Sequence, residues 1–482
     1  METGQSSKGI APQSLTLYDK AKDELDKIKT RNKAFYIIIM LVVFGTFFDA
    51  IEQYNAGYAS NAVSTLFHLN ALTISTQVEF ITFSFMAIGA IIAGVMGDYL
   101  GRRFLYSFNL LIYAVGALIS ALAINYDMYL LGRIVVGLGL GGEIAVGLTL
   151  ISEVVPLSIR GQYTGLVNVG PGFGIFAVAA IAVIFLGPFA GVFGGALVSW
   201  RWFLGILIIP ALLVLFYRRY IPETPRFLIS KGKSMLAFKV IKMLSENKLY
   251  PMSTLDSKYK DEDIENQYHI AGLSSIYEKP SIKDIFAGIY LKRSVYLIIL
   301  SFVTFGVTAS LTISYPFLFA GADATLHLST TFYLTSLINF GTLLGTLTAA
   351  YLGKFSRRKV LTILGILAAL FLGLTIVDHA FAYALVFSLF LYALFGYASN
   401  TSIWLYSPEL YPTRARNIGT GLILVSSLAG VAVMLLIVTS IYSAYGLVGL
   451  GVLGLVLYLV YSAIMWSLGT ETSMKDLEMV SP

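Results

Sequence analysis

Two stretches of this sequence share one pattern: Glu-Val-Val-Pro-Leu-Ser-Ile-Arg at 153–160 and Glu-Leu-Tyr-Pro-Thr-Arg-Ala-Arg at 409–416. In each, Pro follows Glu by three residues, Arg follows Pro by four, and a Gly comes five residues later. The two stretches lie 256 residues apart in a chain of 482 residues. A pattern that returns about half a chain later predicts two related halves.

The composition indicates which class of protein these halves form. Hydrophobic residues make up 57% of the chain and charged residues 12%, whereas soluble proteins carry roughly 25% charged residues. So few charges cannot cover the surface of a soluble protein of this size, which excludes an ordinary soluble enzyme, a nucleic-acid-binding protein and a disordered chain. The sequence therefore predicts an all-α membrane protein that crosses the bilayer several times.

Twelve apolar runs have the length of roughly 20 residues that a membrane-spanning helix needs. The first six are 34–56, 76–97, 104–124, 128–152, 161–186 and 200–217. The second six are 293–319, 329–351, 359–378, 381–406, 416–442 and 445–467. We expect a cytoplasmic N-terminal segment without a signal peptide (1–33), a six-helix bundle (34–217), a cytoplasmic linker with short helices (218–292), a second six-helix bundle (293–467) and a cytoplasmic tail (468–482). A solvated linker without helices is the alternative for 218–292.

The basic residues predict how these helices are oriented. If the N-terminus is cytoplasmic, 31 of the 33 Lys and Arg residues lie in the N-terminal segment, the linker, the tail or the loops on the same side. The other two are Arg133, inside a span, and Arg201, at an outer boundary. This asymmetry follows the positive-inside rule and predicts a multi-pass plasma-membrane protein with both termini cytoplasmic. The net charge of +6 then reflects orientation and attraction to anionic lipid, not binding of nucleic acid.

Two further landmarks repeat in the same order. Gly-Val-Met-Gly-Asp-Tyr-Leu-Gly-Arg-Arg at 94–103 corresponds to Tyr-Leu-Gly-Lys-Phe-Ser-Arg-Arg-Lys at 351–359, with a glycine in place of the aspartate. Pro-Glu-Thr at 222–224 corresponds to Gly-Thr-Glu-Thr at 469–472. Three landmarks in matching order predict two bundles related by an axis along the membrane normal, with a substrate site between them.

These motifs resemble the major facilitator superfamily over residues 34–478, and the stretch 94–103 is similar to its signature loop. Other stretches resemble its sugar-porter branch and, equally, that branch's organic-ion and nicotinate-type metabolite-transporter relatives. These stretches are Gly132-Arg133-x-x-x-Gly137, Glu153 to Gly161, Pro222 to Arg226 and Pro408 to Arg414. The resemblance implies the major facilitator fold and transport by alternating access.

Few ionisable residues lie inside the predicted spans, where they are costly and usually functional. Asp49 in the first span and Arg133 in the fourth lie roughly 10 and 8 Å from the outer ends of their spans, so we expect them to pair. Protonation of Asp49 would break the pair and couple a proton to a conformational change. The resemblance adds that an Asp and an Arg at matching positions are held to do this in proton-coupled sugar porters. A static salt bridge is the alternative.

Three further acids accompany this pair. Glu52 lies three residues beyond Asp49 on the same helix face and is either a second coupling residue or a surface residue at the outer rim. Glu143, beside a run of glycines, is a second proton carrier, a cation ligand, or an acid hydrogen-bonded to a neighbouring helix. Glu79 lies near the outer end of the second span. The predicted proton-coupling set is Asp49, Arg133, Glu143 and Glu52.

Charged residues also gather at the inner ends of the predicted helices. Opposite charges at such positions can bridge the two halves when the inner side is closed and separate when it opens. The resemblance implies inner-gate salt bridges there, whereas the alternative is that the charges only anchor helix ends. The predicted cytoplasmic gate comprises Asp98, Arg102, Arg103, Glu153, Arg160, Glu223, Arg226, Glu409 and Arg416.

Candidate substrate contacts combine an aromatic ring with amides and hydroxyls, which suits hydroxylated or heteroaromatic ligands. By resemblance, Trp404 matches a tryptophan that packs on sugar, and Asn168 replaces a glutamine that binds sugar hydroxyls. For each Asn, an interhelical hydrogen bond is the alternative. The predicted substrate-binding set is Asn168, Asn339, Asn400, Trp404, Tyr315, Thr308 and Ser427.

The function that we expect is secondary active transport of a small organic solute, a sugar or similar polyol, by proton-coupled symport. A single Arg among several intramembrane acids argues against a phosphate or dianion substrate. The alternatives are a uniporter or antiporter of an organic ion or aromatic metabolite, and a non-transporting receptor on the same fold.

Enzymes and metal sites are disfavoured by the sequence. No span carries His-Glu-x-x-His or Gly-x-Ser-x-Gly, so we expect no catalytic site. The chain has no cysteine, and its four histidines are far apart, so we expect no metal and no cofactor. The expected partners are the solute, the proton and the lipid bilayer, and we expect a monomer.

Overall fold

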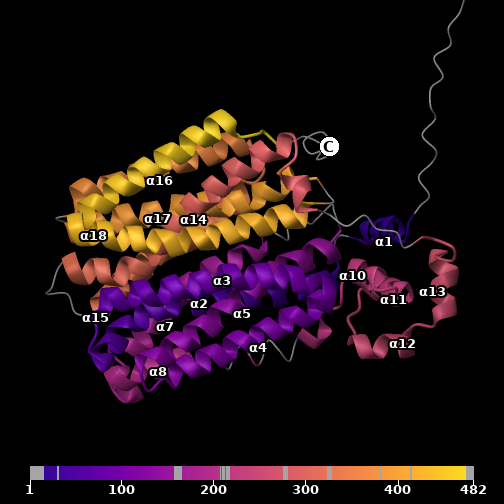
Figure 1. The fold of residues 1–482 in the computed structure, drawn as a ribbon, viewed down its shortest axis with the longest axis horizontal. Coiled ribbons are helices and arrows are strands. Elements are labelled where there is room, and N and C mark those ends of the chain that lie inside the picture. Colours follow the sequence, from indigo (N-terminus) through magenta and orange to yellow (C-terminus); the bar gives the residue numbers. More distant parts are fainter. Residues whose placement is uncertain are drawn as a thin grey trace, which may run out of the picture.

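The computed structural model shows two groups of long helices lying side by side (Figure 1). It describes residues 16–29, 32–156, 166–206, 208, 212, 218–274, 281–322, 328–379, 381–412 and 415–473. The first group contains α2 (Lys33–Phe67), α3 (Ala71–Leu100), α4 (Arg102–Ala121), α5 (Tyr126–Val154), α7 (Val169–Leu186), η1 (Ala190–Phe193) and α8 (Ala196–Gly205). The second group contains α14 (Ile289–Ala322), α15 (Leu328–Leu352), α16 (Arg357–Asp378), α17 (Ala382–Tyr406), η5 (Ser407–Leu410) and α18 (Arg416–Leu468).

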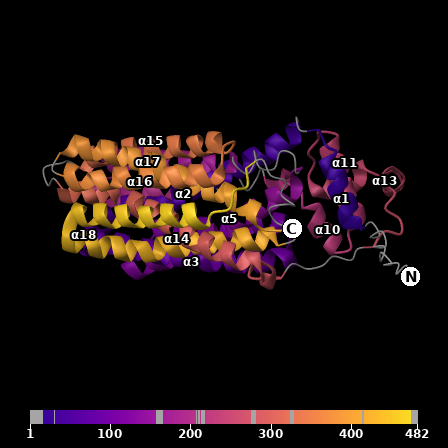
Figure 2. The ribbon, with the colours of Figure 1, turned by 90° about the horizontal axis from the view of Figure 1, so that it is seen from above.

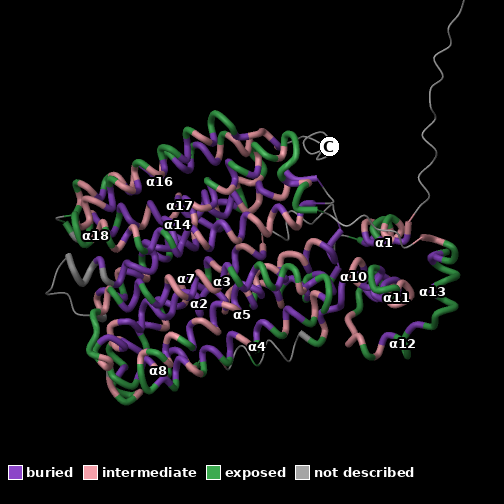
Figure 3. The backbone as a smooth tube through the Cα atoms, viewed as in Figure 1, coloured by how far each residue is buried: buried purple, intermediate pink, exposed green. Residues whose placement is uncertain are grey.

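Ten helices in the described ranges are long and apolar enough to cross a membrane. One of them, α18, includes both of the last two predicted spans, and its backbone leaves helical geometry at Gly446, near the start of the last predicted span, with φ 61° and ψ −152°. The predicted span 200–217 lies partly outside the described residues, and α8 covers its beginning. Figure 3 shows that exposed residues lie along the outer sides of the helices, and many of them have large apolar side chains, which suits contact with lipid chains.

Asparagine caps mark where three of these helices begin. The side-chain oxygens of Asn32, Asn70 and Asn125 accept backbone N–H groups in the first turns of α2, α3 and α5. Such caps satisfy donors that have no partner within the helix. α2 continues to Phe67, well beyond residue 56, where the sequence predicted its end. The extra turns contain several small and polar residues, and they therefore resemble a loop in a hydropathy reading.

Glycines let α3 and α5 pack backbone to backbone. A Cβ added at Gly141 would lie 1.9 Å from the carbonyl oxygen of Met86, and one added at Gly89 would lie 2.3 Å from that of Leu138. Close approach of this kind is typical of membrane helices, because small residues maximise van der Waals contact. It holds α5, with its buried arginine, directly against α3.

The linker folds into a small helical layer that lies beside the first group, at the right-hand end of the molecule in Figure 1, and we call this end of both groups the linker end (Figures 1 and 2). α1 (Leu17–Asp26), from the N-terminal segment, packs on α10 (Pro225–Ser230) and α11 (Ser234–Ser245). Its Leu17 and Leu25 share one apolar cluster with Phe238 and Ile241 of α11. Short helices therefore occupy the segment predicted to be a linker. They are η2 (Arg218–Tyr220), α10 (Pro225–Ser230), α11 (Ser234–Ser245), η3 (Met252–Thr254), α12 (Leu255–Lys258), α13 (Asp261–Tyr268) and η4 (Ile282–Ile285).

The two groups meet mainly where α3 packs on α18 and α7 packs on α15. Hydrogen bonds cross between them towards the end opposite the linker, which we call the far end, and at the linker end. Toward the far end they are Tyr54–Tyr397 (3.2 Å), Asn339–Tyr58 (3.0 Å) and Thr76–Thr439 (2.8 Å), and at the linker end the bond is Ser152–Asn417 (3.3 Å). The two halves are therefore in contact both toward the far end and at the linker end.

Candidate functional site

A cavity of about 100 Å³ lies between the two halves, several times the space that one water molecule needs. The first half lines it with Thr46, Asp49, Ala50, Gln53, Tyr54, Ile144, Leu148, Val167, Asn168, Pro171, Gly172 and Ile175. The second half lines it with Phe305, Thr346, Tyr397, Asn400, Thr401, Trp404, Leu424 and Leu428. Its wall is therefore mostly apolar and aromatic, with amide and hydroxyl groups and one carboxylate among the described residues.

Four residues that the sequence singled out meet in this cavity. Asp49 comes from α2, Asn168 precedes α7, and Asn400 and Trp404 lie one turn apart on α17. Their side chains belong to both halves, so a solute held here would contact both. Amide groups can donate and accept hydrogen bonds, the carboxylate accepts them, and an indole offers a flat apolar face.

Four other predicted contacts do not line this cavity. Asn339 donates to the Tyr58 hydroxyl (3.0 Å) and to the carbonyl of Ile175 (3.3 Å), so it ties the halves together. The hydroxyl groups of Thr308 and Ser427 donate to carbonyls of their own helices, and Tyr315 is fully buried on α14. In this conformation Asn339 therefore makes interhelical hydrogen bonds, which was the alternative to a substrate contact.

Several cavity residues were not predicted from the sequence, although one signal for them was available. Thr46, Asp49, Ala50 and Gln53 recur at the three- and four-residue spacing of one helix face. Once Asp49 is placed in a cavity, that spacing predicts the others. The same spacing on α17, counted from the predicted residues Asn400 and Trp404, predicts Tyr397 and Thr401.

Arg133 forms a buried ion pair with Glu52, which corrects the pairing with Asp49 that the sequence predicted. The Nη1 atom of Arg133 lies 2.9 Å from Oε1 of Glu52, and the two side chains are 0% and 1% exposed. Nη1 also donates to Asn55, Nη2 to the Glu52 carbonyl, and Nε to Thr82. The wrong pairing came from the predicted end of the first span. The depth of Asp49 was counted from residue 56, but α2 continues to Phe67, so Asp49 lies farther from the far end than the sequence predicted.

The position of Glu52 also decides between its two predicted locations. It is not a surface residue at the outer rim, since it is buried in the interior of α2 and accepts a second hydrogen bond from Asn55 (2.8 Å). Glu143 is likewise buried, on α5, next to the cavity-lining Ile144 but not itself lining the cavity. Glu79, which the sequence placed near a helix end, is fully buried on α3.

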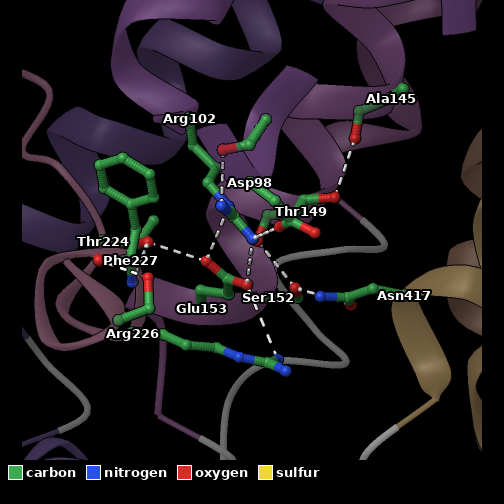
Figure 4. Close-up of polar contacts among 12 residues, drawn as sticks. Asp98, Arg102, Ala145, Thr149, Ser152, Glu153, Thr224, Arg226, Phe227 and Asn417 are labelled. Atoms are coloured by element: carbon green, nitrogen blue, oxygen red, sulfur yellow. Dashed lines mark hydrogen bonds and ion pairs between the residues drawn. The ribbon is translucent and has the colours of Figure 1, made fainter. Parts of the chain in front are cut away.

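At the linker end, charged residues of the first half form a compact cluster (Figure 4). Arg102 pairs with Asp98 (2.7 Å) and with Glu153 (3.2 Å), and Arg226 lies 3.7 Å from Glu153. Glu223 accepts the backbone N–H groups of Arg102 (3.0 Å) and Arg103 (3.4 Å). Burial raises the pKa of the Glu223 carboxyl, and these backbone donors only partly offset it.

The second half repeats this cluster with equivalent residues. Arg357 pairs with Glu409 (2.7 Å), as Arg102 does with Glu153. Glu471 accepts the backbone N–H of Arg357 (3.0 Å). Although burial acts to raise it, the pKa of Glu471 is lowered by hydrogen bonds from the Ser356 hydroxyl and from backbone N–H groups. The threonines correspond too, since Thr224 donates to Glu153 (2.8 Å) and Thr472 donates to Glu409 (2.5 Å).

In the part of the chain that the structure describes, these ion pairs join helices of one half to each other or, at Arg226, to the linker. The expectation that they bridge the two halves is therefore not met in this conformation. Among the described residues, a hydrogen bond from Ser152 to Asn417 crosses between the halves at the linker end, beside the first cluster (Figure 4). Arg416 is buried at the start of α18, and Arg160 lies outside the described residues.

Comparison with known proteins identifies the family. The sequence matches the family described as "Sugar (and other) transporter" over residues 33–482. The chain belongs to this family, within the major facilitator superfamily. Because the family's fold spans the membrane many times, this chain is a membrane protein. The sequence-based assignment to this superfamily is confirmed.

Individual relatives have different substrates in their names. The chain is 28% identical to the glucose transporter GlcP of Staphylococcus epidermidis over 403 residues, which cover 80% of this chain and 83% of that protein. It is 26% identical to the niacin transporter NiaP of Acinetobacter baylyi over 469 residues, covering 93% and 97%. The fold matches that of the E. coli proton:xylose symporter XylE bound to 6-bromo-6-deoxy-D-glucose, with a TM-score of 0.68, 18% identity and coverage of 92% and 98%.

Proposed function

We propose that this chain is a secondary active transporter that moves a small organic solute, a sugar or similar polyol, across the plasma membrane by alternating access. The observation that supports this most directly is the cavity between the halves, with cross-half hydrogen bonds both toward the far end and at the linker end. Rocking of one half against the other would break one set of bonds at a time and open the cavity to each side in turn.

The cavity lining favours a neutral, hydroxylated solute. Asn168, Asn400 and Gln53 offer amides, Asp49 offers an acceptor, and Trp404 offers an aromatic face. The described lining includes no lysine or arginine to pair with a phosphate or dianion. The named substrates of GlcP and XylE are sugars, which agrees with this choice.

We further propose that transport is proton-coupled symport, with Asp49 as the coupling residue in the cavity. A carboxylate that faces the cavity is exposed to water on whichever side is open, so it can gain a proton on one side and lose it on the other. This differs from the mechanism expected from the sequence, because Arg133 forms its ion pair with Glu52. Protonation of Asp49 therefore does not have to break an ion pair with Arg133.

The topology that accompanies this proposal has twelve spans, with the linker end and both termini in the cytoplasm. The pairs Arg102–Glu153 and Arg357–Glu409 then lie at the inner ends of the two halves, as inner-gate anchors. The chain acts as a monomer in the lipid bilayer.

A second candidate is a uniporter or antiporter of an organic ion or aromatic metabolite. The four aromatic rings that line the cavity, from Tyr54, Phe305, Tyr397 and Trp404, favour it, because flat aromatic solutes stack on such rings. The name of NiaP, a niacin transporter, agrees with this alternative.

The test begins with a thermal-shift screen of sugars, polyols, aromatic acids and amines, since a bound solute raises the melting temperature by mass action. The stabilising solute is then offered to proteoliposomes with an inside-alkaline gradient. Symport predicts accumulation that a protonophore abolishes, and Asp49→Asn should keep exchange but lose accumulation. Uptake that ignores the gradient would refute symport, and stabilisation only by aromatic acids or amines would favour the second candidate.

A further inference from the structure

A second buried carboxylate lies beside the Arg133–Glu52 pair. Glu79, on α3, is 0% exposed, and Arg133 and Glu52 are its charged neighbours. One of its carboxylate oxygens would lie 3.7 Å from a Cβ added at Gly57 of α2. Two carboxylates therefore share one arginine in a closed site within the bundle.

The hydrogen bonds of Arg133 go to α2 and Thr82, not to Glu79. Both oxygens of Glu52 are occupied, one by Arg133 (2.9 Å) and one by Asn55 (2.8 Å). Within the described residues, no side chain donates a hydrogen bond to either oxygen of Glu79, and the group that favours its charged form besides Arg133 is the backbone N–H of Gly57. An ionised Glu79 would give this closed site a net negative charge, which is strongly unfavourable away from water.

We propose that Glu79 binds a proton in this conformation and is a proton site of the protein separate from the cavity residue Asp49. Two carboxylates that share a site do not readily ionise together, because the second charge is repelled by the first. With Glu79 protonated, the single positive charge of Arg133 is balanced by the single negative charge of Glu52. The proton is taken from solution and returned to it, with no other chemistry.

The groups that face Glu79 support this charge balance. From α2 they are Glu52 and Tyr54, and from α5 they are Arg133 and Tyr129. The side chain of the second half that lies nearest to Gly57 is Ile313, on α14, at 3.3 Å from the added Cβ. Neither tyrosine adds a positive charge, and Ile313 is apolar, so none of these groups replaces a second arginine.

The second half covers this site. Ile313 packs against Gly57, and Thr76, one turn before Glu79 on α3, is hydrogen-bonded to Thr439 of α18. Tyr54, two residues after Glu52, is bonded to Tyr397 of α17. Separation of the halves at the far end would therefore bring water to Glu79, and closure would remove it.

This arrangement makes closure of the far end dependent on a proton. An open far end lets Glu79 ionise in contact with water, and the halves close over it only after it takes up a proton from the solution on that side. This step rests on the alternating access proposed above, whereas protonation in the closed state stands independently of the transported solute.

The first test is infrared spectroscopy of the purified protein at neutral pH. The wild type should show the C=O band of a protonated, buried carboxyl group, and Glu79→Gln should lose it. Asp49→Asn should keep this band. Asp127→Asn should also keep it, because Asp127 is an exposed carboxylate in the first turn of α5, the end of that helix that carries Arg133. An unchanged band in Glu79→Gln would overturn the proposal.

The second test measures closure without any solute. The chain has no cysteine, so spin labels can be attached to cysteines at Leu69 and Tyr383, which are exposed at the far end of the two halves. Raising the pH should lengthen the distance between the labels in the wild type and in Asp127→Asn. In Glu79→Gln this distance should stay short at every pH. A Glu79→Gln profile like that of the wild type would overturn the coupling to closure. Melting curves of each variant confirm that it is folded.

These two tests separate this proposal from the transport proposal. Neither uses a solute, so loss of accumulation in Asp49→Asn with an unchanged infrared band would support both. An absent band with intact proton-driven uptake would overturn the Glu79 site and leave proton-coupled transport in place.

Discussion

Arg133 Nη1 lies 2.9 Å from Glu52 Oε1, and both side chains are buried. This pair joins α5 to α2 behind the cavity, while Asp49, one turn earlier on α2, faces the cavity itself. Two acids three residues apart thus have different surroundings and, by our proposal, different tasks. One balances a structural arginine, and the other meets the solute.

A double-mutant cycle on Glu52 and Glu79 tests how Arg133 is balanced. Removing one partner of a buried pair costs about 3–5 kcal/mol, but in Glu52→Gln the neighbouring Glu79 can ionise and replace the lost charge. We therefore expect a loss of about 1–2 kcal/mol for Glu52→Gln and under about 1 kcal/mol for Glu79→Gln. The double variant should lose about 3–5 kcal/mol, more than the two single losses together.

The measurement for this cycle is the shift of the melting temperature in detergent. Asp49→Asn is the matched control, because it removes a carboxylate from the same helix without touching the pair. Additive losses would show that Glu79 does not compensate for Glu52. A loss in Asp49→Asn as large as in the double variant would restore the pairing with Arg133 that the sequence predicted.

Much of the fold could be predicted from the sequence, because hydropathy, charge asymmetry and the repeat are local or periodic features. The repeat aligned Arg102 with Arg357 and Glu153 with Glu409, which form equivalent ion pairs, although the predicted gate did not include Arg357. The partner of Arg133 could not be predicted in this way. It depends on how far α2 is rotated and shifted against α5, and the spacing of residues along the sequence determines neither the rotation nor the shift.

The candidate site was predicted in part, for a related reason. Asp49, Asn168, Asn400 and Trp404 line the cavity, and each stands out in the sequence as a polar or aromatic residue within an apolar span. Glu79 was placed only near the outer end of its span, and nothing in the sequence indicated that the opposite half covers this part of α3.

Trp404 should contribute to solute affinity. Its ring lines the cavity from α17, and its truncation would remove a flat surface on which a sugar or aromatic solute packs. We expect Trp404→Ala to raise Kd about tenfold, equal to about 1.4 kcal/mol, and Trp404→Phe to raise it less. Equilibrium binding of the solute found by thermal shift measures this. Trp202→Ala, at an exposed tryptophan on α8, should leave Kd unchanged, and an unchanged Kd in Trp404→Ala would remove Trp404 from the binding site.

Lys239 should hold the linker helices together below strongly alkaline pH. Its Nζ lies 2.6 Å from both Asp256 and Asp261, and although burial acts to lower it, these carboxylates raise the pKa of Lys239 above its ordinary value of 10.5. A raised lysine pKa gives stability that is complete below the unfolded value and is lost as pH rises through the folded value.

The measurement for Lys239 is backbone hydrogen exchange in α12 and α13. Lys239→Met keeps the apolar stem and removes the charge, so exchange there should become faster by the equivalent of about 1 kcal/mol. Lys248→Met, which removes a more exposed pair with Glu246, should not change it. Equal exchange in Lys239→Met and the wild type would show that the two ion pairs do not fasten these helices.

Gly141 should be indispensable for the contact between α3 and α5. An alanine Cβ there would meet the Met86 carbonyl oxygen at 1.9 Å, and backbone atoms cannot move aside as a flexible side chain can. We expect Gly141→Ala to cost about 1–3 kcal/mol or more and to lower the melting temperature in detergent.

The matched control is Gly421→Ala on α18, where a Cβ would meet nothing within 4 Å. There the loss of backbone freedom in the unfolded chain should make the change neutral or stabilising by about 0.5–1 kcal/mol. If both variants had the melting temperature of the wild type, α3 and α5 would not pack as closely as the structure has them. The close packing that holds Arg133 in its ion pair with Glu52 would then be absent.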